Sequence, residues 1–253
     1  MQDKFKKKYE GKVFQTNSSG SLVIDKYVDN KNVHVRFINT GYRAVVSMGN
    51  IKTGVVKDRL KPSVFGVGII GDVSGKIAGS DEFKEYKLWS KMLQRCYDVK
   101  LQEKYATYVG CSVSENFKYY QHFKKWCREQ IGFNKNGFEL DKDLLIKGNK
   151  VYSEDTCVFL PHQINSTLTK SDKVRGRYPI GVTYDKKSSQ FRAQITICGD
   201  HLTIGFYTTP EEAFQAYKAT KEAYIKEVAN EWKDQIDPRA YEALMGYQVE
   251  ITD

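Results

Sequence analysis

Apolar and polar residues alternate most clearly between residues 178 and 223. Three short segments there have a period of two, which predicts strands at 179–184, 190–197 and 201–207. In the middle segment Ala193 and Ile195 fall on one face, while Arg192 and Gln194 fall on the other. The pattern therefore predicts a small sheet with one packed face and one face free to contact a ligand.

The segment after the third strand predicts a helix that covers the packed face. Thr209 suits the N-cap, Glu212 completes a capping box, and Pro210 suits the first helical position. An apolar stripe with small alanines lets this helix lie close on the sheet. A second, short helix is expected from Asp237-Pro238 to about residue 245.

Residues 11–70 are predicted to be all-β. Apolar alternation with turn residues between the segments predicts strands at 22–27, 33–37 and 43–48, in a small barrel or strongly bent sheet. Glycines at five positions between residues 66 and 79 then indicate a linker, with its main part at 71–80.

The middle of the chain shows helical spacing. Helices are predicted at about 81–97 and 115–131, with a tyrosine-rich loop between them. Two strands, 138–146 and 151–160, are predicted to form a hairpin about residues 147–149, and the segment 153–156 is typical of a turn.

The expected fold class is α+β, with three modules and two connections. We divide the chain into a basic β-rich module, a linker, a helix-helix-β-hairpin module, a basic flexible tether and a C-terminal module of three strands plus helix, at 1–70, 71–80, 81–165, 166–177 and 178–253.

The net charge of the chain indicates a class of partner. The 253 residues include 40 Lys and Arg against 31 Asp and Glu, a formal charge of +9. Such a surface field favours a polyanion, and nucleic acid is the first candidate; a basic surface that is merely solvated remains the alternative. Neither a signal peptide nor a membrane span of about 20 apolar residues is found, which predicts a protein of the cytoplasm, whether of its own cell or of a host cell.

Five cysteines at wide spacing argue against a disulfide framework. Reduced, mostly buried thiols are expected, and a structural zinc site remains an alternative because four of the five lie in the middle third. The sequence does not indicate an oligomeric state.

Residues 86–165 resemble the relatives of phage HNH-type homing endonucleases. The resemblance rests on Tyr86-x-x-Trp89-x-x-Met92, Arg95-Cys96-Tyr97, Cys111, Phe117, Phe123, Trp126, Leu140-Asp141-Lys142-Asp143 and Tyr152-Ser153-x-x-Thr156-Cys157-Val158-Phe159. It implies a ββα-metal type of centre that cuts DNA with one divalent cation.

Such a centre needs a general base, usually His, and ligands for the cation. Asp141 and Asp143 are the candidate catalytic residues and the candidate Mg²⁺ ligands, and Asn149 is a third catalytic candidate that steers the hairpin. Lys142 stands where the histidine is expected, which leaves His122 and His162 as other candidates for the base. The alternative for Asp141 and Asp143 is a hairpin with solvated charges or salt bridges and no catalytic role.

The C-terminal module resembles the AP2/ERF DNA-binding domain. The shared pattern is Gly181-Val182, Phe191-Arg192-Ala193-Gln194-Ile195, Ile204-Gly205-Phe206-Tyr207 and Thr209-x-Glu211-Glu212-Ala213-x-x-Ala216-Tyr217. In that family the exposed sheet face enters the major groove. The resemblance thus implies contacts to double-stranded DNA by Thr183, Lys186, Lys187, Arg192, Gln194, Thr196, His201 and Thr203.

Threonines replace several arginines and tryptophans of that family at 183, 196 and 203, which predicts weaker sequence specificity. Three functions stay open from the sequence. The protein is a DNA endonuclease, a DNA-binding regulator or masking factor without cutting activity, or a module that binds an acidic protein partner.

Overall fold

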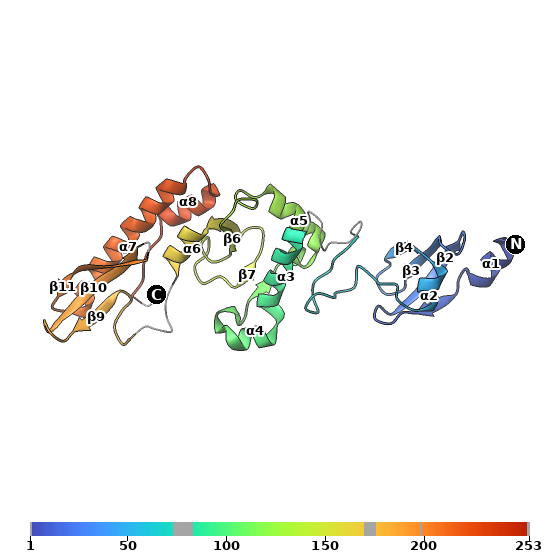
Figure 1. The fold of residues 1–253 in the computed structure, drawn as a ribbon, viewed down its shortest axis with the longest axis horizontal. Helices are drawn as coiled ribbons and strands as arrows, with labels where there is room; N and C mark the ends of the chain where they lie inside the picture. Colours follow the sequence, from blue (N-terminus) through green and yellow to red (C-terminus); the bar gives the residue numbers. More distant parts are fainter. Residues whose placement is uncertain (1, 73–82, 170–175, 198, 252–253) are drawn as a thin grey trace. The chain divides into compact units, whose positions relative to one another are not determined.

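The computed structural model describes residues 2–72, 83–169, 176–197 and 199–251. The fold is mixed α+β with several small sheets, as predicted, and the chain divides into two compact units, Met1–Lys125 and Trp126–Asp253 (Figure 1). Within the described ranges, no helix is both long and apolar enough to cross a membrane.

The first unit begins with an antiparallel meander. Its strands are β1 (Val13–Gln15), β2 (Ser21–Tyr27), β3 (Val33–Phe37) and β4 (Arg43–Val46), in that spatial order. The three predicted strands are confirmed, whereas β1, α1 (Gln2–Tyr9) and α2 (Met48–Lys52) were not expected. The inward side chains of β2 and β3 form a core with α2, and Leu22, Ile24 and Val33 are wholly buried.

The segment 66–70 is packed rather than a linker. Gly68 lies so close to α3 (Phe83–Tyr97) that a Cβ there would fall 2.5 Å from Leu93 Cδ1. Ile69 forms a parallel bridge with Tyr119. Glycine composition therefore marked close packing in this stretch, and residues 73–80 of the predicted linker lie outside the described residues.

The helical part of the first unit is organised around Trp89 of α3. This side chain is wholly buried, and its indole N–H donates a 2.7 Å hydrogen bond to the carbonyl of Phe117. The predicted loop after α3 contains α4 (Val99–Lys104), a 3₁₀ turn η1 (Ala106–Tyr108) and β5 (Ser112–Val113).

The second predicted helix is interrupted. A 3₁₀ turn, η2 (Asn116–Lys118), precedes α5 (Tyr120–Glu129), and the extended backbone of Tyr119 separates the two. The prediction of one continuous helix over 115–131 was therefore wrong, because Ile69 pairs with the extended residue between the two pieces.

In the second unit, β6 (Phe138–Asp141) pairs antiparallel with β8 (Val158–Pro161). The predicted antiparallel pairing of the segments 138–146 and 151–160 is confirmed, but the tight turn at 147–149 is wrong, because β6 ends at Asp141 and the whole segment 142–157, including β7 (Val151–Tyr152), connects the paired strands. Helix α6 (His162–Leu168) then occupies the first three residues of the predicted tether, and residues 170–175 lie outside the described residues.

The C-terminal sheet has the order β11-β10-β9. The strands β9 (Val182–Asp185), β10 (Gln190–Ile197) and β11 (Asp200–Tyr207) confirm the three predicted segments. Helix α7 (Pro210–Trp232) begins with the predicted capping box, and α8 (Pro238–Met245) follows it.

Helix α7 serves two cores. Its first half, with Phe214 and Tyr217, packs on the sheet, whereas Ile225 and Val228 pack with α6, β8 and α8 (Figure 1). The sheet is therefore fixed to the rest of the second unit by one continuous helix.

Candidate nucleic-acid interface

The C-terminal sheet has one covered and one open face because side chains alternate along its central strand, β10. Ala193 and Ile195 are buried in the core that the sheet forms with α7. Arg192 and Gln194 are half-buried and Thr196 is exposed, all three on the opposite side. The predicted division of the strand into two faces is thus confirmed.

Strand pairing brings the other predicted contact residues to the open face. Directly opposed residues of antiparallel strands lie on the same face, and the pairs here are Thr183 with Arg192, Thr203 with Gln194, and His201 with Thr196. Six of the eight predicted DNA contacts are therefore assembled on one surface.

Side-chain hydrogen bonds orient parts of this surface. Arg192 Nε donates to Thr183 Oγ1 at 3.4 Å, and Thr196 Oγ1 lies 2.8 Å from His201 Nδ1. Gln194 has its backbone N–H bonded to the carbonyl of Gly181 at 2.8 Å. The guanidinium of Arg192 and the amide of Gln194 are thus presented from an anchored strand.

A β-bulge sets the register of the open face. Pairing shifts from Ala193 with Gly205 to Gln194 with Thr203, so Ile204 has no direct partner on β10. The extra residue allows Thr203 and Phe206 to face the same way although they are three residues apart.

Sequence reasoning missed Phe206 as a surface residue. It lies opposite Arg192 on the open face and is 46% exposed. Its position as the next-to-last residue of an alternating strand could have marked it, but the bulge reverses the face that simple alternation from His201 assigns.

The remaining two predicted contacts, Lys186 and Lys187, lie in the exposed turn between β9 and β10. Asp185 shapes this turn by accepting hydrogen bonds from the Lys187 N–H and the Ser188 hydroxyl. The Lys187 N–H is the main reason that the pKa of Asp185 is lowered, and Arg192 contributes to the shift. The only carboxylate next to the two lysines is therefore occupied with the turn.

A hollow of about 700 Å³ borders the same face. Gln194, Thr196 and His201 line it from the sheet, and Lys221 lines it from α7. Burial lowers the pKa of Lys221, since removal from water disfavours its charged form. The hollow therefore adds a desolvated cation beside the neutral donors and acceptors of the face.

Charge within the C-terminal module is unevenly distributed. Residues 178–253 carry eight Lys and Arg against twelve Asp and Glu, but ten of those carboxylates belong to residues 211–253, in and after α7. Residues 178–210 carry three cations and two carboxylates. The sheet side is thus the more positive side of an acidic module.

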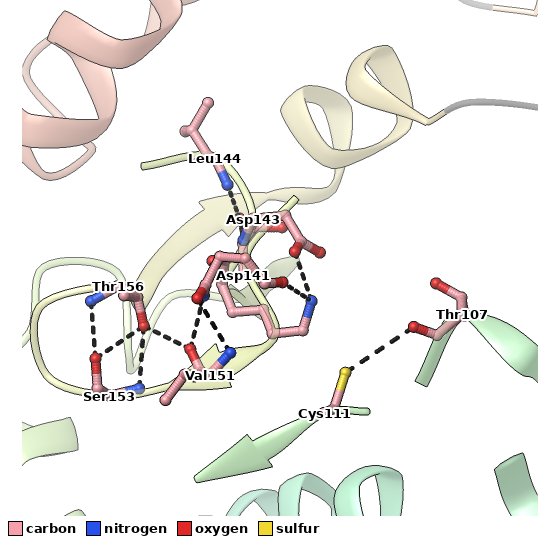
Figure 2. Close-up of polar contacts among 10 residues, drawn as sticks. Thr107, Cys111, Asp141, Asp143, Leu144, Val151, Ser153 and Thr156 are labelled. Carbon is pink, nitrogen blue, oxygen red and sulfur yellow. Dashed lines mark hydrogen bonds and ion pairs between the residues drawn. The ribbon is translucent and has the colours of Figure 1, made fainter. Parts of the chain in front are cut away.

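The candidate nuclease residues form a hydrogen-bonded loop after β6. Asp141 accepts hydrogen bonds from the backbone N–H groups of Asp143 and Leu144 at 2.9 and 2.8 Å (Figure 2). Burial raises the pKa of Asp141, and these two donors partly offset the shift. Its carboxylate therefore closes the turn that ends the strand.

Lys142 bridges the other two candidates. Its side chain is buried, its Nζ lies 2.5 Å from Asp143 Oδ1, and it donates to the carbonyl of Asn149 at 3.1 Å. Asn149 in turn donates to the carbonyls of Lys142 and Val151. The structure thus brings Asp141, Asp143 and Asn149 together, with an ammonium group among them.

This arrangement does not fit a divalent cation held by both carboxylates. The ammonium of Lys142 already neutralises Asp143, and one oxygen of Asp141 is bonded to two backbone donors. Over the described parts of the chain, no group of three or more His, Cys, Asp and Glu residues is arranged to hold a metal.

The two candidate histidines have other neighbours in the structure. His162 begins α6, is well exposed, and places Nδ1 3.6 Å from Glu139 Oε1. His122 lies in α5 beside the ring of Phe117, in the first unit. Among described residues of the second unit, His162 forms no hydrogen bond or ion pair with Asp141 or Asp143.

The four described cysteines are buried, namely Cys96, Cys111, Cys127 and Cys157. Burial raises the pKa of Cys157 to about 12, so its thiol is protonated at neutral pH.

Comparison with known proteins returns no match. Neither a protein-family model, nor a curated protein, nor a solved structure is similar to this chain. The two resemblances therefore rest on the residues given above.

Proposed function

We propose that this protein binds double-stranded DNA through the open face of the β9-β10-β11 sheet, in the manner of the AP2/ERF module that it resembles. The observation that supports this most is the shared orientation of Arg192, Gln194 and their threonine neighbours, with α7 covering the opposite face. Sheet faces and ribbons of this size enter the major groove.

The chemistry of the face suits both kinds of DNA contact. Arg makes paired hydrogen bonds to guanine, and Gln makes them to adenine. Threonine hydroxyls and the turn lysines Lys186 and Lys187 supply contacts to phosphate, which position the protein without selecting a sequence. A face with two strong base-reading side chains predicts modest sequence preference.

For the central module, which resembles the HNH group, we propose a role in binding rather than cutting. The supporting observation is the ion pair between Lys142 and Asp143, in the place where the resemblance expects a base and a metal ligand. A cutting enzyme remains the competing function, and it requires Asp141 and Asp143 to release their present partners and take up Mg²⁺.

A plasmid assay separates binding from cutting. Wild-type protein is incubated with supercoiled plasmid and Mg²⁺ or Mn²⁺, beside an Asp141→Ala control. The proposal predicts intact plasmid in both samples. Nicking or linearisation by the wild type alone shows a metal-dependent nuclease and overturns the binding-only role.

Duplex binding tests the sheet face itself. A preferred site is selected from a random duplex pool, and its affinity is compared for wild type, Arg192→Ala, Arg192→Lys and Gln194→Ala. Each alanine variant is expected to lose about 1–3 kcal/mol. The lysine variant keeps the charge but not the paired hydrogen bonds, so it separates base reading from phosphate contact.

Lys226→Ala is the matched control, because Lys226 is an exposed cation on the helix that covers the other face. Wild-type affinity is expected for it. DNA binding that is absent, or insensitive to salt, contradicts the proposal and favours an acidic protein partner.

A further inference from the structure

The N-terminal module carries a large share of the positive charge of the chain. Residues 1–72 hold thirteen Lys and Arg against six Asp and Glu, a formal charge of +7, whereas residues 73–177 carry +6 and residues 178–253 carry −4. The C-terminal sheet module is acidic, so its open face accounts for little of the long-range attraction to a polyanion. The basic N-terminal module is therefore the place to look for a second surface that attracts a polyanion.

The outer face of the β1–β4 sheet gathers cations by strand pairing. Lys26 on β2 lies opposite His34 on β3, and Arg36 on β3 lies opposite Arg43 on β4. The inward neighbours of these residues, such as Val35, are buried in the core. Like charges placed opposite each other destabilise a sheet, so the Arg36–Arg43 pair has a cost in folding free energy.

A groove of about 1340 Å³ extends from this face to the segment 55–63. Six basic residues line it: Lys26, His34, Arg43, Lys57, Arg59 and Lys61. They come from three strands, β2, β3 and β4, and from the segment 55–63, and the fold brings them to one hollow.

The carboxylates that line the groove are already engaged. Asp25 pairs with Arg36 at 3.3 Å. Asp58 accepts hydrogen bonds from the Thr40 hydroxyl at 2.6 Å and from the Leu60 N–H at 2.9 Å. Asp72 hydrogen-bonds to the Tyr42 hydroxyl, and this contributes to the raised pKa of that tyrosine after burial itself.

Three of the groove cations have no such partner. Within the part of the chain that the structure describes, Lys26, Arg43 and Lys57 form no ion pair, and all three are exposed. An anion that enters the groove therefore meets cations that it does not have to separate from a carboxylate.

The aromatic lining favours phosphate over bases as the group that is bound. Proteins that hold single strands stack bases on free aromatic rings. Here Tyr42 packs against Phe37 and Tyr86 packs against Tyr120, so both lining rings are occupied within the fold. The groove thus suits the sugar–phosphate backbone of a duplex.

We propose that this N-terminal groove is a second docking surface for double-stranded DNA, which binds the phosphate backbone without regard to sequence. The proposal rests on the proposed function for the kind of partner, but not on the sheet face as the place of contact. The groove supplies affinity and the C-terminal sheet supplies sequence preference.

Salt titration of duplex binding by the full-length protein tests the groove. The logarithm of affinity falls with the logarithm of salt concentration by about 0.9 per phosphate contact. The double variant Arg43→Ala/Lys57→Ala is expected to lower that slope by about two on both random and selected duplexes. Both side chains are exposed, so the fold is retained, which a thermal melt verifies.

Lys31→Ala/Lys52→Ala is the matched control. It removes the same charge from exposed positions of the same module that do not line the groove. A wild-type slope is expected. An equal loss of slope in both double variants, or no loss in the groove variant, overturns the docking surface.

Gln194→Ala separates this result from the proposed function. Gln194 is neutral, so its loss is expected to leave the salt slope unchanged while it reduces the preference for the selected duplex. A reduced slope in the groove variant with unchanged preference in Gln194→Ala sustains the groove and refutes the sheet face. An unchanged slope in the groove variant with a reduced preference in Gln194→Ala refutes the groove and sustains the sheet face.

Discussion

Gly181 gives the most direct test of how the C-terminal sheet lies on its helix. The residue precedes β9, has a φ of +76°, and lies against the ring of Tyr217. A Cβ at Gly181 would fall 2.5 Å from Cε2 of Tyr217 and closer to two other ring atoms, whereas ordinary contacts begin near 3.4 Å. Tyr217 is buried, so its ring has little room to move.

The expected effect of Gly181→Ala has two parts. A positive φ costs about 1–2 kcal/mol for a residue with a Cβ. Forcing an extra carbon into the packed contact with Tyr217 costs about 1–3 kcal/mol more. The variant should therefore lose about 2–5 kcal/mol of unfolding free energy.

Gly137→Ala isolates the packing part. Gly137 has a φ of +77° but no atom within 4 Å of its would-be Cβ, and it belongs to the same unit. Gly137→Ala should lose only the backbone contribution, about 1–2 kcal/mol of unfolding free energy. Urea unfolding of both full-length variants, followed by circular dichroism and by hydrogen exchange of β10 amides, measures the difference. Equal losses in the two variants refute the close approach of the sheet to α7.

Three further predictions concern the cap of α7, the central loop and the thiols. Thr209→Ala should lose about 1 kcal/mol of unfolding free energy in urea, since it removes the capping box. Hydrogen bonds from Thr208 and Thr209 lower the pKa of Glu212, so the carboxylate stabilises the fold fully above the ordinary glutamate pKa and loses this effect as the pH falls through the lowered value. Stability that depends on pH as steeply in Glu212→Gln as in wild type contradicts this. Lys142→Met should lose about 1.5–3 kcal/mol, because a hydrogen bond to a charged group is removed, and wild-type stability would show that the ion pair with Asp143 is unimportant. Cys157 should resist iodoacetamide at pH 8 until the protein is denatured, and rapid labelling of the native protein, found by peptide mapping, would contradict its burial and raised pKa.

Local patterns predicted much of the C-terminal fold. The residues of β10 alternate strictly, and Thr209 and Glu212 form a capping box that depends only on residues three apart. The sequence did not predict where α7 ends, because its second half packs on α6 and β8, which are distant in sequence. The helix propensity of a local segment carries no information about such long-range contacts.

The candidate sites divide in the same way. Period-two alternation placed Arg192 and Gln194 on the open face, but it did not show Phe206 there, because the bulge opposite Ala193 is a property of the pairing of two strands. The tight turn predicted at 147–149 was wrong for a similar reason, although the segments on either side of it pair as predicted. Strand β6 ends where the Asp141 carboxylate bonds to backbone N–H groups, and this turn draws Lys142 inward to Asp143.

Contact between the open face of the β9-β10-β11 sheet and DNA bases is tested by one comparison of affinities. Wild type, Gln194→Ala and Lys226→Ala are each measured on a selected duplex and on a random one, at one salt concentration. Gln194→Ala is expected to lose about 1–3 kcal/mol on the selected duplex only, with wild-type behaviour for Lys226→Ala. Unchanged affinity of Gln194→Ala for both duplexes, or no duplex binding by the wild type, would contradict it.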